Sequence, residues 1–156
     1  MTPGIKLIKS SGFFHQIHEY QHDSSAASYG LEAVEKMQVV AERVFKTLVV
    51  KTEKNKFVVA VLPVLPQLSM KRLAKSVNAK KAEMAEKNIV EKMTGYVLGG
   101  VCPLGQKKKL TTIIDKSAME HQTIFVSAGR RGIEIELKPQ DLISLTQAQL
   151  ADILQI

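Results

Sequence analysis

The chain has 156 residues, of which 45% are hydrophobic and 24% are charged, and its formal net charge is +7. These proportions exclude a disordered chain and predict a single domain over residues 1–156, since enough apolar side chains are present to form a core. Apolar runs fall short of the roughly 20 residues of a membrane span, and the one cysteine excludes an intramolecular disulfide, so we expect a cytoplasmic protein without a membrane partner.

The first elements are predicted from local start and stop signals. Thr2 and Pro3 are typical of a helix start, and Gly12 is typical of a helix end, which predicts a short helix between them. The next elements are expected to be a strand, a polar loop and a helix, over residues 13–20, 21–28 and 31–37.

A β-hairpin is predicted next. The β-branched and aromatic residues of Val44–Val50 and Phe57–Leu62 indicate two strands, joined by a polar turn through Asn55. Pro63 and Pro66 end the second strand, because proline lacks the amide hydrogen that a ladder requires.

Helices and strands follow without a regular βαβ alternation. Ser69 predicts the start of one helix, and Gly95 the end of another over Glu86–Met93. Strands are expected over residues 110–114, 123–127 and 133–137. Pro139 predicts a C-terminal helical region that contains Leu142, Ile143, Leu145, Leu150 and Ile153. This order predicts an α+β fold with a mixed, largely antiparallel sheet or open barrel flanked by helices.

Lys46 is a candidate catalytic residue because it lies in the middle of a predicted strand. Val44, Leu48 and Val50 share its face, so its ammonium group is expected among apolar neighbours. Removing an ammonium group from water costs several kcal/mol unless a partner compensates it. The alternative is a lysine whose stem is packed and whose charged end reaches water.

Signatures of a metal site or a protein nucleophile are weak. In the predicted strand His15 and His18 point to opposite faces, whereas zinc needs three or four converging ligands. Cys102 has no histidine near it in sequence and is best explained as a small, partly buried residue beside a turn. Ser127 lacks the context of a nucleophile elbow and is more credible as a ligand-binding hydroxyl. We therefore expect no metal, no cofactor and no protein nucleophile.

The predicted strand Ile133–Leu137 alternates apolar and acidic residues. Glu134 and Glu136 share the face opposite its apolar side chains, and a pair of carboxylates can perform acid–base chemistry. A solvated face is the other interpretation, and it is the one we favour for Glu136.

Basic side chains are clustered, which favours a polyanionic partner, because such clusters gain affinity by releasing condensed counterions. The lack of tryptophan argues against a stacking platform for bases and favours recognition through phosphate and shape. The clusters are Lys71-Arg72, Lys80-Lys81, Lys107-Lys108-Lys109 and Arg130-Arg131.

The segment from Gly95 to Lys107 is the most specific motif. Its Gly-Tyr-x-x-Gly-Gly-x-x-Pro-Leu-Gly-Gln-Lys pattern closely resembles a segment of the YbaK family, free-standing deacylases that clear misacylated tRNA. Other parts of the chain also resemble this family: Met1-Thr2-Pro3, Tyr20-Gln21-His22-Asp23, Gly30, Phe45-Lys46-Thr47-Leu48, Lys80-Lys81, Glu83-Met84-Ala85, Ser127, Gly129, Arg131 and Gly132. The resemblance implies a fold related to the editing domain of bacterial prolyl-tRNA synthetases.

The resemblance also implies an activity, namely trans-editing of Cys-tRNA(Pro), in which the thiol of the mischarged cysteine attacks its own ester bond. Lys46 is then implied to neutralise phosphate or oxyanion charge, and Tyr20 to position the substrate. The implied substrate contacts are Gly99, Gly100, Ser127, Gly129 and Glu134, the last of which stands where some relatives carry an aspartate. The implied tRNA contacts are Lys107, Lys108, Arg130 and Arg131.

Two alternatives stay open. The same basic surface suits a non-catalytic adaptor that binds tRNA or a synthetase, and the same fold suits an alanine-specific deacylase. Selection of the tRNA by a bound prolyl-tRNA synthetase is expected, because a positive surface alone does not read an anticodon.

Overall fold

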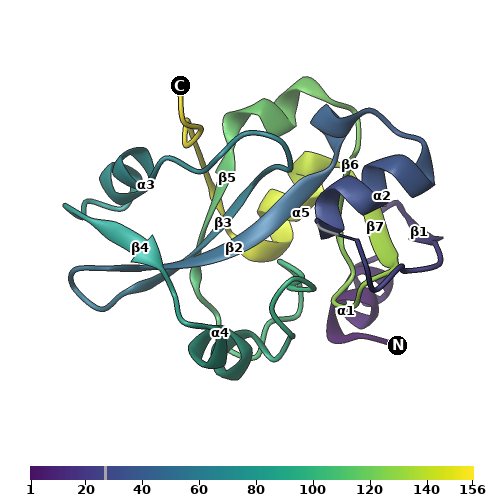
Figure 1. Ribbon diagram of the computed structural model, residues 1–156, viewed down its shortest axis with the longest axis horizontal. Helices are drawn as coiled ribbons and strands as arrows, with labels where there is room; N and C mark the ends of the chain where they lie inside the picture. Colours follow the sequence, from purple (N-terminus) through teal and green to yellow (C-terminus); the bar gives the residue numbers. More distant parts are fainter. Residues whose placement is uncertain (27) are drawn as a thin grey trace.

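The computed structural model describes residues 1–26 and 28–156, which fold into two open β-sheets surrounded by helices (Figure 1). The smaller sheet is antiparallel, with the order β1 (His15–Glu19), β7 (Ile133–Leu137) and β6 (Ile124–Ser127). Its register places His18 opposite Glu134, and Ser127 also opposite Glu134. Ile17, Ile135 and Val126 share one face of this sheet, whereas His18, Glu134 and Ser127 share the opposite face, which is the more polar of the two.

The larger sheet is mixed. Its strands, in spatial order, are β4 (Ala82–Met84), β2 (Phe45–Thr52), β3 (Phe57–Pro63), β5 (Thr111–Asp115) and β8 (Gln149–Ala151). The β2–β3 and β2–β4 pairs are antiparallel, whereas β3–β5 and β5–β8 are parallel. The predicted α+β class with largely antiparallel, open sheets is confirmed, as is the hairpin.

Apolar cores lie on both faces of the larger sheet. In Figure 1, α3 (Met70–Ser76) and α4 (Lys87–Thr94) lie on opposite sides of it. Leu73 of α3 packs with Val50 and Val58, while Val90 of α4 joins the core that contains Val49. Side chains of α1 (Pro3–Ser11) and α5 (Pro139–Thr146) also pack into the core that contains Val49. The helix α2 (Tyr29–Met37) covers part of the smaller sheet instead.

Local signals determine the helix ends. The Thr2 hydroxyl accepts a hydrogen bond from the Ile5 amide at 3.2 Å, and Gly12 ends α1 with φ of 78°. Gly95 ends α4 in the same left-handed conformation. These ends agree with the predictions from sequence. No helix in the described residues is long and apolar enough to span a membrane.

The predicted C-terminal helical region is too long. The helix α5 ends at Thr146, because Gln147 adopts a left-handed conformation and donates its amide to the Ile143 carbonyl. Leu150 lies in β8, and the buried Ile153 donates its amide to Asp115 at 3.1 Å. The helical assignment of Leu150 and Ile153 is therefore wrong, since Leu150 lies in the parallel edge strand β8 and Ile153 follows it in an irregular segment bonded to Asp115.

Three short elements were absent from the predictions. They are β4 and two 3-10 helices, η1 (Ala41–Arg43) and η2 (Lys116–Glu120). Each is only three to five residues long, which leaves too few positions for a periodic pattern in the sequence.

Candidate functional site

A cavity of about 450 Å³ lies where the two sheets approach each other. Its walls come from β2, the end of β4, the start of α2, the glycine-rich loop after α4 and the polar face of the smaller sheet. It brings together six of the residues predicted for the site: Tyr20, Lys46, Gly99, Ser127, Arg131 and Glu134.

The other predicted site residues lie outside this lining. Gly100 is buried behind the loop, and a Cβ atom there would lie 3.6 Å from the Arg130 backbone. Gly129 has φ of 107°, and a Cβ atom there would come within 2.3 Å of the Tyr96 ring. Glycine is required at Gly129, because a side chain there would clash with Tyr96, whereas a Cβ atom at Gly100 would make an ordinary van der Waals contact. Lys107 and Lys108 lie beside the C-terminal end of α4, with their amides bonded to the carbonyls of Thr94 and Met93 and their side chains exposed.

Lys46 is partly buried and is held by backbone carbonyls. Its Nζ atom donates to the carbonyls of Val64 at 3.1 Å and Pro66 at 2.9 Å. Burial lowers the pKa of Lys46 below its usual value. No carboxylate of the described residues forms an ion pair with it. An ammonium group has three N–H donors, so one donor of Lys46 remains for a ligand. Among the described residues, the positive charge of Lys46 is not neutralised by an ion pair.

Glu134 and Tyr20 supply neutral proton donors to the cavity. Glu134 is 7% exposed, and burial raises the pKa of its carboxyl to about 8. Burial, followed by the charge of Glu134, raises the pKa of Tyr20 to about 12. At neutral pH both side chains are therefore largely protonated. Ser127 lies nearby, and its hydroxyl accepts a hydrogen bond from the Gly129 amide at 3.2 Å.

One wall of the cavity is built around Tyr29. The Arg131 guanidinium lies 3.4 Å from the centroid of the Tyr29 ring, and its Nη1 atom lies 3.4 Å from Nε2 of His22. His22 in turn contacts the buried carboxylate of Glu32 at 2.7 Å. Burial favours a higher pKa for Glu32, but hydrogen bonds from the Asp23 amide, His22 and Lys36 hold it below its usual value. Arg131 is thus anchored in the wall of the cavity.

Local sequence patterns do not single out Tyr29 or Thr47, which line the cavity, or Glu32, which supports its wall through His22. A Cβ atom at Gly99 would lie 2.0 Å from the Tyr29 ring, so Gly99 and Tyr29 are in direct contact although they are far apart in sequence. Such contacts depend on the packing of α2 against the glycine-rich loop and have no local signal in the sequence.

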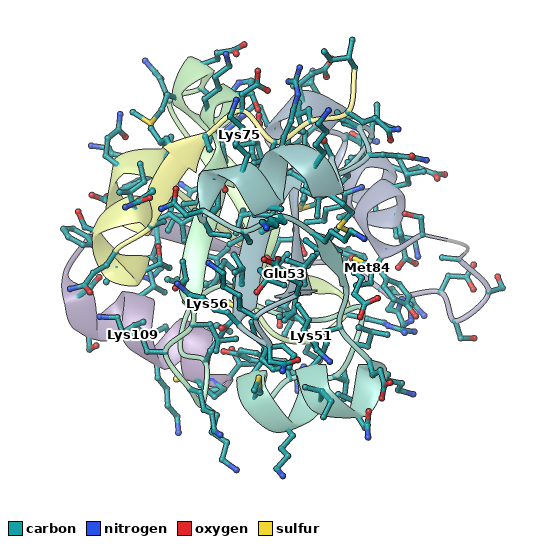
Figure 2. All side chains as sticks on the ribbon, turned by 90° about the vertical axis from the view of Figure 1, so that its left-hand side faces the viewer. Lys51, Glu53, Lys56, Lys75, Met84 and Lys109 are labelled. Atoms are coloured by element: carbon teal, nitrogen blue, oxygen red, sulfur yellow. The ribbon has the colours of Figure 1, made fainter. Side chains whose placement is uncertain are left out.

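Positive charge collects at the hairpin end of the larger sheet. Figure 2 shows Lys51, Lys56, Lys75 and Lys109 spread over this end of the molecule, around Glu53. The Glu53 carboxylate accepts hydrogen bonds from the backbone amides of Lys80 and Lys81, both at 3.0 Å. It is therefore used to fix a turn, and the lysine side chains of this surface keep a net positive charge.

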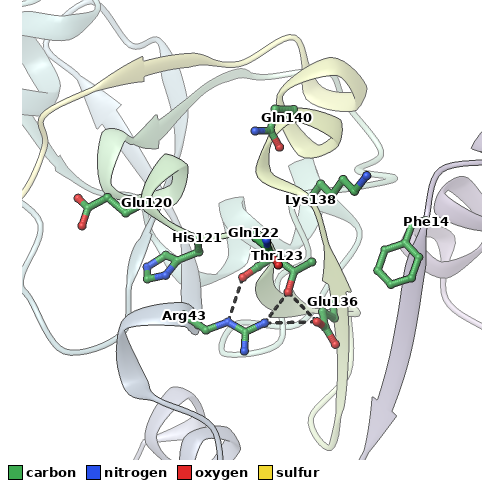
Figure 3. Close-up of a pocket in the computed structure, with 9 residues that line it drawn as sticks. All are labelled: Phe14, Arg43, Glu120, His121, Gln122, Thr123, Glu136, Lys138 and Gln140. Atoms are coloured by element: carbon green, nitrogen blue, oxygen red, sulfur yellow. Dashed lines mark hydrogen bonds and ion pairs between the residues drawn. The ribbon is translucent and has the colours of Figure 1, made fainter.

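A larger and more open hollow, of about 970 Å³, lies beyond Arg43 (Figure 3). Arg43 donates to the Thr123 carbonyl at 3.1 Å and to Glu136 at 3.3 Å, and the Thr123 hydroxyl donates to Glu136 at 2.6 Å. His18 contacts the other Glu136 oxygen at 2.8 Å. These groups already satisfy one another, and none of the predicted site residues lines this hollow, so we do not place the site there.

The predicted solvated position of Glu136 is wrong. Its side chain is 15% exposed and lies within this polar cluster. Burial favours a higher pKa, but hydrogen bonds from Thr123 and His18, with the charge of Arg43, hold the pKa of Glu136 below its usual value. The partners come from β1, from η1 and from the residue before β6, and these segments are far from one another in the sequence.

Cys102 is fully buried, and burial raises the pKa of its thiol to about 12. The thiol is therefore protonated and inaccessible, which excludes it as a nucleophile in this conformation. Within residues 1–26 and 28–156, no group of three or more His, Cys, Asp or Glu side chains is placed to hold a metal ion. The cavity thus offers an unpaired ammonium group, a phenol, a protonated carboxyl group and exposed backbone. This set can orient a ligand that is already activated and stabilise charge on it.

Comparison with known proteins gives a consistent result. Residues 24–145 match the model of the aminoacyl-tRNA editing domain. The chain is 41% identical over 136 residues to EbsC of Enterococcus faecalis, a candidate Cys-tRNA(Pro)/Cys-tRNA(Cys) deacylase, covering 86% of this chain and 83% of that protein. It is 28% identical over 128 residues to the uncharacterised YwhH of Bacillus subtilis, covering 82% and 79%.

Two solved structures share the fold. A candidate trans-editing enzyme for prolyl-tRNA synthetase superposes with a TM-score of 0.85 at 20% identity, over 100% of this chain and 99% of that chain. The hypothetical protein APE2540 superposes with a TM-score of 0.86 at 22% identity, over 99% and 100%.

Proposed function

Because the chain belongs to the aminoacyl-tRNA editing domain family, we propose that it is a trans-editing deacylase that removes cysteine from Cys-tRNA(Pro) in the cytoplasm, with residues 1–156 acting as one domain. The observation that supports this most is the cavity itself. It joins Lys46, Tyr20 and Glu134 with the glycine-rich loop, while the only thiol of the chain is buried. Such a site suits a substrate that supplies its own nucleophile.

The proposed reaction uses the cysteine thiol of the substrate. Its sulfur attacks the ester carbonyl, a C–S bond forms, and the C–O bond to the terminal ribose breaks. The thiol proton ends on the ribose oxygen, and the first product is a cyclic thiolactone that water opens to cysteine. The protein then contributes orientation and stabilisation of the oxyanion, without a covalent intermediate.

We assign each cavity residue to a part of the substrate from the charge and the hydrogen-bonding groups of that residue. The free donor of Lys46 neutralises phosphate or oxyanion charge, and Tyr20 positions the terminal nucleotide. Glu134, protonated near neutral pH, donates a hydrogen bond to the substrate, whereas an ionised carboxylate would repel its phosphate. The backbone of Gly99 and the side chain of Ser127 contact the aminoacyl end, and Gly100 and Gly129 support the loops behind these two residues.

Misacylated tRNA is the proposed partner, held by Lys107, Lys108, Arg130 and Arg131, with prolyl-tRNA synthetase selecting the tRNA. Lys107 and Lys108 are exposed, which supports a contact with phosphate. Replacing both with glutamine should reduce the slope of log(kcat/KM) against log salt by about 1 to 2, roughly one for each lost phosphate contact. An unchanged slope would move the RNA contact to another surface.

The deciding experiment compares substrates. Purified protein is mixed with Cys-tRNA(Pro), Ala-tRNA(Pro) and Pro-tRNA(Pro), and release of each amino acid is followed with and without prolyl-tRNA synthetase. The proposal predicts rapid loss of cysteine and little loss of the other two. Rapid loss of alanine would identify an alanine-specific deacylase. Tight tRNA binding without release of any amino acid would identify an adaptor.

A further inference from the structure

Thr47 carries a buried hydroxyl group that has no partner. Its Oγ1 atom is the one buried side-chain polar atom among the described residues that makes no hydrogen bond. Thr47 also lines the cavity described above. Buried polar groups in proteins are almost always hydrogen-bonded, so an exception beside a cavity points to a ligand that supplies the missing partner.

The backbone N–H and C=O groups of Thr47 also point away from the neighbouring strand β3. The Val64 amide donates to the Val44 carbonyl at 3.0 Å, and the Thr52 amide donates to the Lys56 carbonyl at 2.9 Å. Between these two bonds the register pairs Thr47 with Val61. Hydrogen-bonded and non-hydrogen-bonded pairs alternate along an antiparallel ladder, so Thr47 and Val61 form a non-hydrogen-bonded pair. The N–H and C=O of Thr47 therefore point toward the opposite edge of β2.

That edge is open at Thr47. The strand β4 pairs only with Val50–Thr52, and its last bond to β2 runs from the Ala85 amide to the Val49 carbonyl at 3.0 Å. On the other side, an isolated bridge joins Val44 to Phe125. No described strand pairs with Thr47 between these two points, and the cavity occupies the gap. An open strand edge is a template for a ligand with complementary donors and acceptors.

We propose that Thr47 binds the aminoacyl group of the substrate as if that group were one residue of an added antiparallel strand. This inference depends on the proposed deacylase function. An aminoacyl ester carries an amino group and a carbonyl group on the same carbon, as a strand residue does. The amino group then donates to the Thr47 carbonyl, and the Thr47 amide donates to the ester carbonyl.

This pairing gives the Thr47 amide a role in the reaction. It donates to the oxygen on which negative charge develops, and its position is fixed by β2 before the substrate arrives. Lys46, one residue earlier, brings positive charge to the same strand.

The pairing also places the side chain of the substrate. Directly opposed strand residues project to the same face, with Cβ atoms about 4.5–5.5 Å apart. The thiol of a cysteinyl group therefore lies beside the Thr47 hydroxyl, next to the apolar side chains of Val49, Val90 and Val101. The thiol of a cysteinyl group can hydrogen-bond to the Thr47 hydroxyl, whereas an alanyl group leaves this hydroxyl without a partner. Thr47 is thus a specificity-determining residue.

The first test removes the amino group of the substrate. 3-Mercaptopropionyl-tRNA(Pro) keeps the thiol and the ester but lacks the amine. Each enzymatic rate is divided by the spontaneous hydrolysis rate of the same ester, because the amine also activates the carbonyl. We expect kcat/KM to fall by about 10- to 100-fold relative to Cys-tRNA(Pro), the loss of one strong hydrogen bond. Equal normalised rates would overturn the strand pairing.

The second test removes the hydroxyl. Thr47→Val keeps the shape of the side chain and should reduce kcat/KM by about 5- to 10-fold for Cys-tRNA(Pro), and by a smaller factor for Ala-tRNA(Pro). Thr47→Ser should restore most of the loss. Thr112→Val is the matched control, since it removes another buried threonine hydroxyl of the same sheet, outside the cavity. A wild-type rate on Cys-tRNA(Pro) in Thr47→Val would overturn the role of the hydroxyl.

The outcomes separate the two proposals. If the wild-type protein releases no cysteine, the deacylase function fails. If it releases cysteine but shows neither the amine effect nor the Thr47 effect, the deacylase stands and the role of Thr47 is refuted.

Discussion

Tyr20 and Glu134 lie on the same polar face of the three-stranded sheet and line one cavity. Burial first, and the negative charge of Glu134 second, raise the pKa of the Tyr20 phenol to about 12, while burial raises the pKa of Glu134 to about 8. Two acidic groups are thus kept protonated at neutral pH. They can donate hydrogen bonds beside a phosphate-bearing ligand without repelling it.

Burial of Glu134 predicts a pH-dependent stability. Its pKa is about 8 in the folded protein against 4.5 ordinarily, so the folded state binds the proton more tightly. The stabilisation is fully present below about pH 4.5 and is lost as pH rises through about 8. Relative to Glu134→Gln, the free energy of unfolding of the wild type should therefore decrease by up to several kcal/mol over this range. This difference in the free energy of unfolding is measured by urea unfolding of both proteins at several pH values. If the two proteins show parallel dependences on pH, the raised pKa of a buried Glu134 carboxyl is contradicted.

The burial of Cys102 predicts an unreactive thiol. In the native protein it should react with an aromatic disulfide reagent at least about 100-fold more slowly than in the urea-unfolded protein, because the thiolate is neither formed nor exposed. Cys102→Ala should retain wild-type cysteine release and lose about 1 kcal/mol of stability. Loss of turnover in a folded Cys102→Ala protein would contradict catalysis without a protein nucleophile.

Gly99 combines a left-handed backbone with close contact to Tyr29. Gly99→Ala should destabilise the protein by about 1–3 kcal/mol and reduce kcat/KM, since a new Cβ atom would lie 2.0 Å from the Tyr29 ring and displace a wall of the cavity. Gly12→Ala is the matched control: its φ of 78° is similar, but nothing lies within 4 Å of the added Cβ. Urea unfolding and cysteine release are measured on both variants. Equal effects on activity would show that the contact with Tyr29 is unimportant.

Local signals predicted much of the fold. Thr2 and Gly12 define α1 through hydrogen bonding and a left-handed conformation, so its ends are recorded in a few adjacent residues. The C-terminal strand was missed because Leu150 and Ile153 have helical spacing, and only the left-handed Gln147 and the parallel edge of β5 decide otherwise.

The candidate site was only partly predictable. Lys46 was identified because a cation in an apolar strand is conspicuous in any sequence. Glu136 was misjudged, since its partners Arg43, His18 and Thr123 come from three distant segments. The open edge at Thr47 depends on where β4 and Phe125 stop pairing with β2, which is a property of the assembled sheet.

The charge of Lys46 is central to this account, because it is the one partly buried ammonium group in the lining of the described cavity. The most direct measurement is single-turnover release of cysteine from Cys-tRNA(Pro) by excess wild-type protein, Lys46→Ala and Lys51→Ala. Lys51 lies on the same strand but outside the cavity, which makes it a matched control. We predict a decrease of about 100-fold or more in Lys46→Ala and a near wild-type rate in Lys51→Ala. A wild-type rate in a folded Lys46→Ala protein would contradict the account.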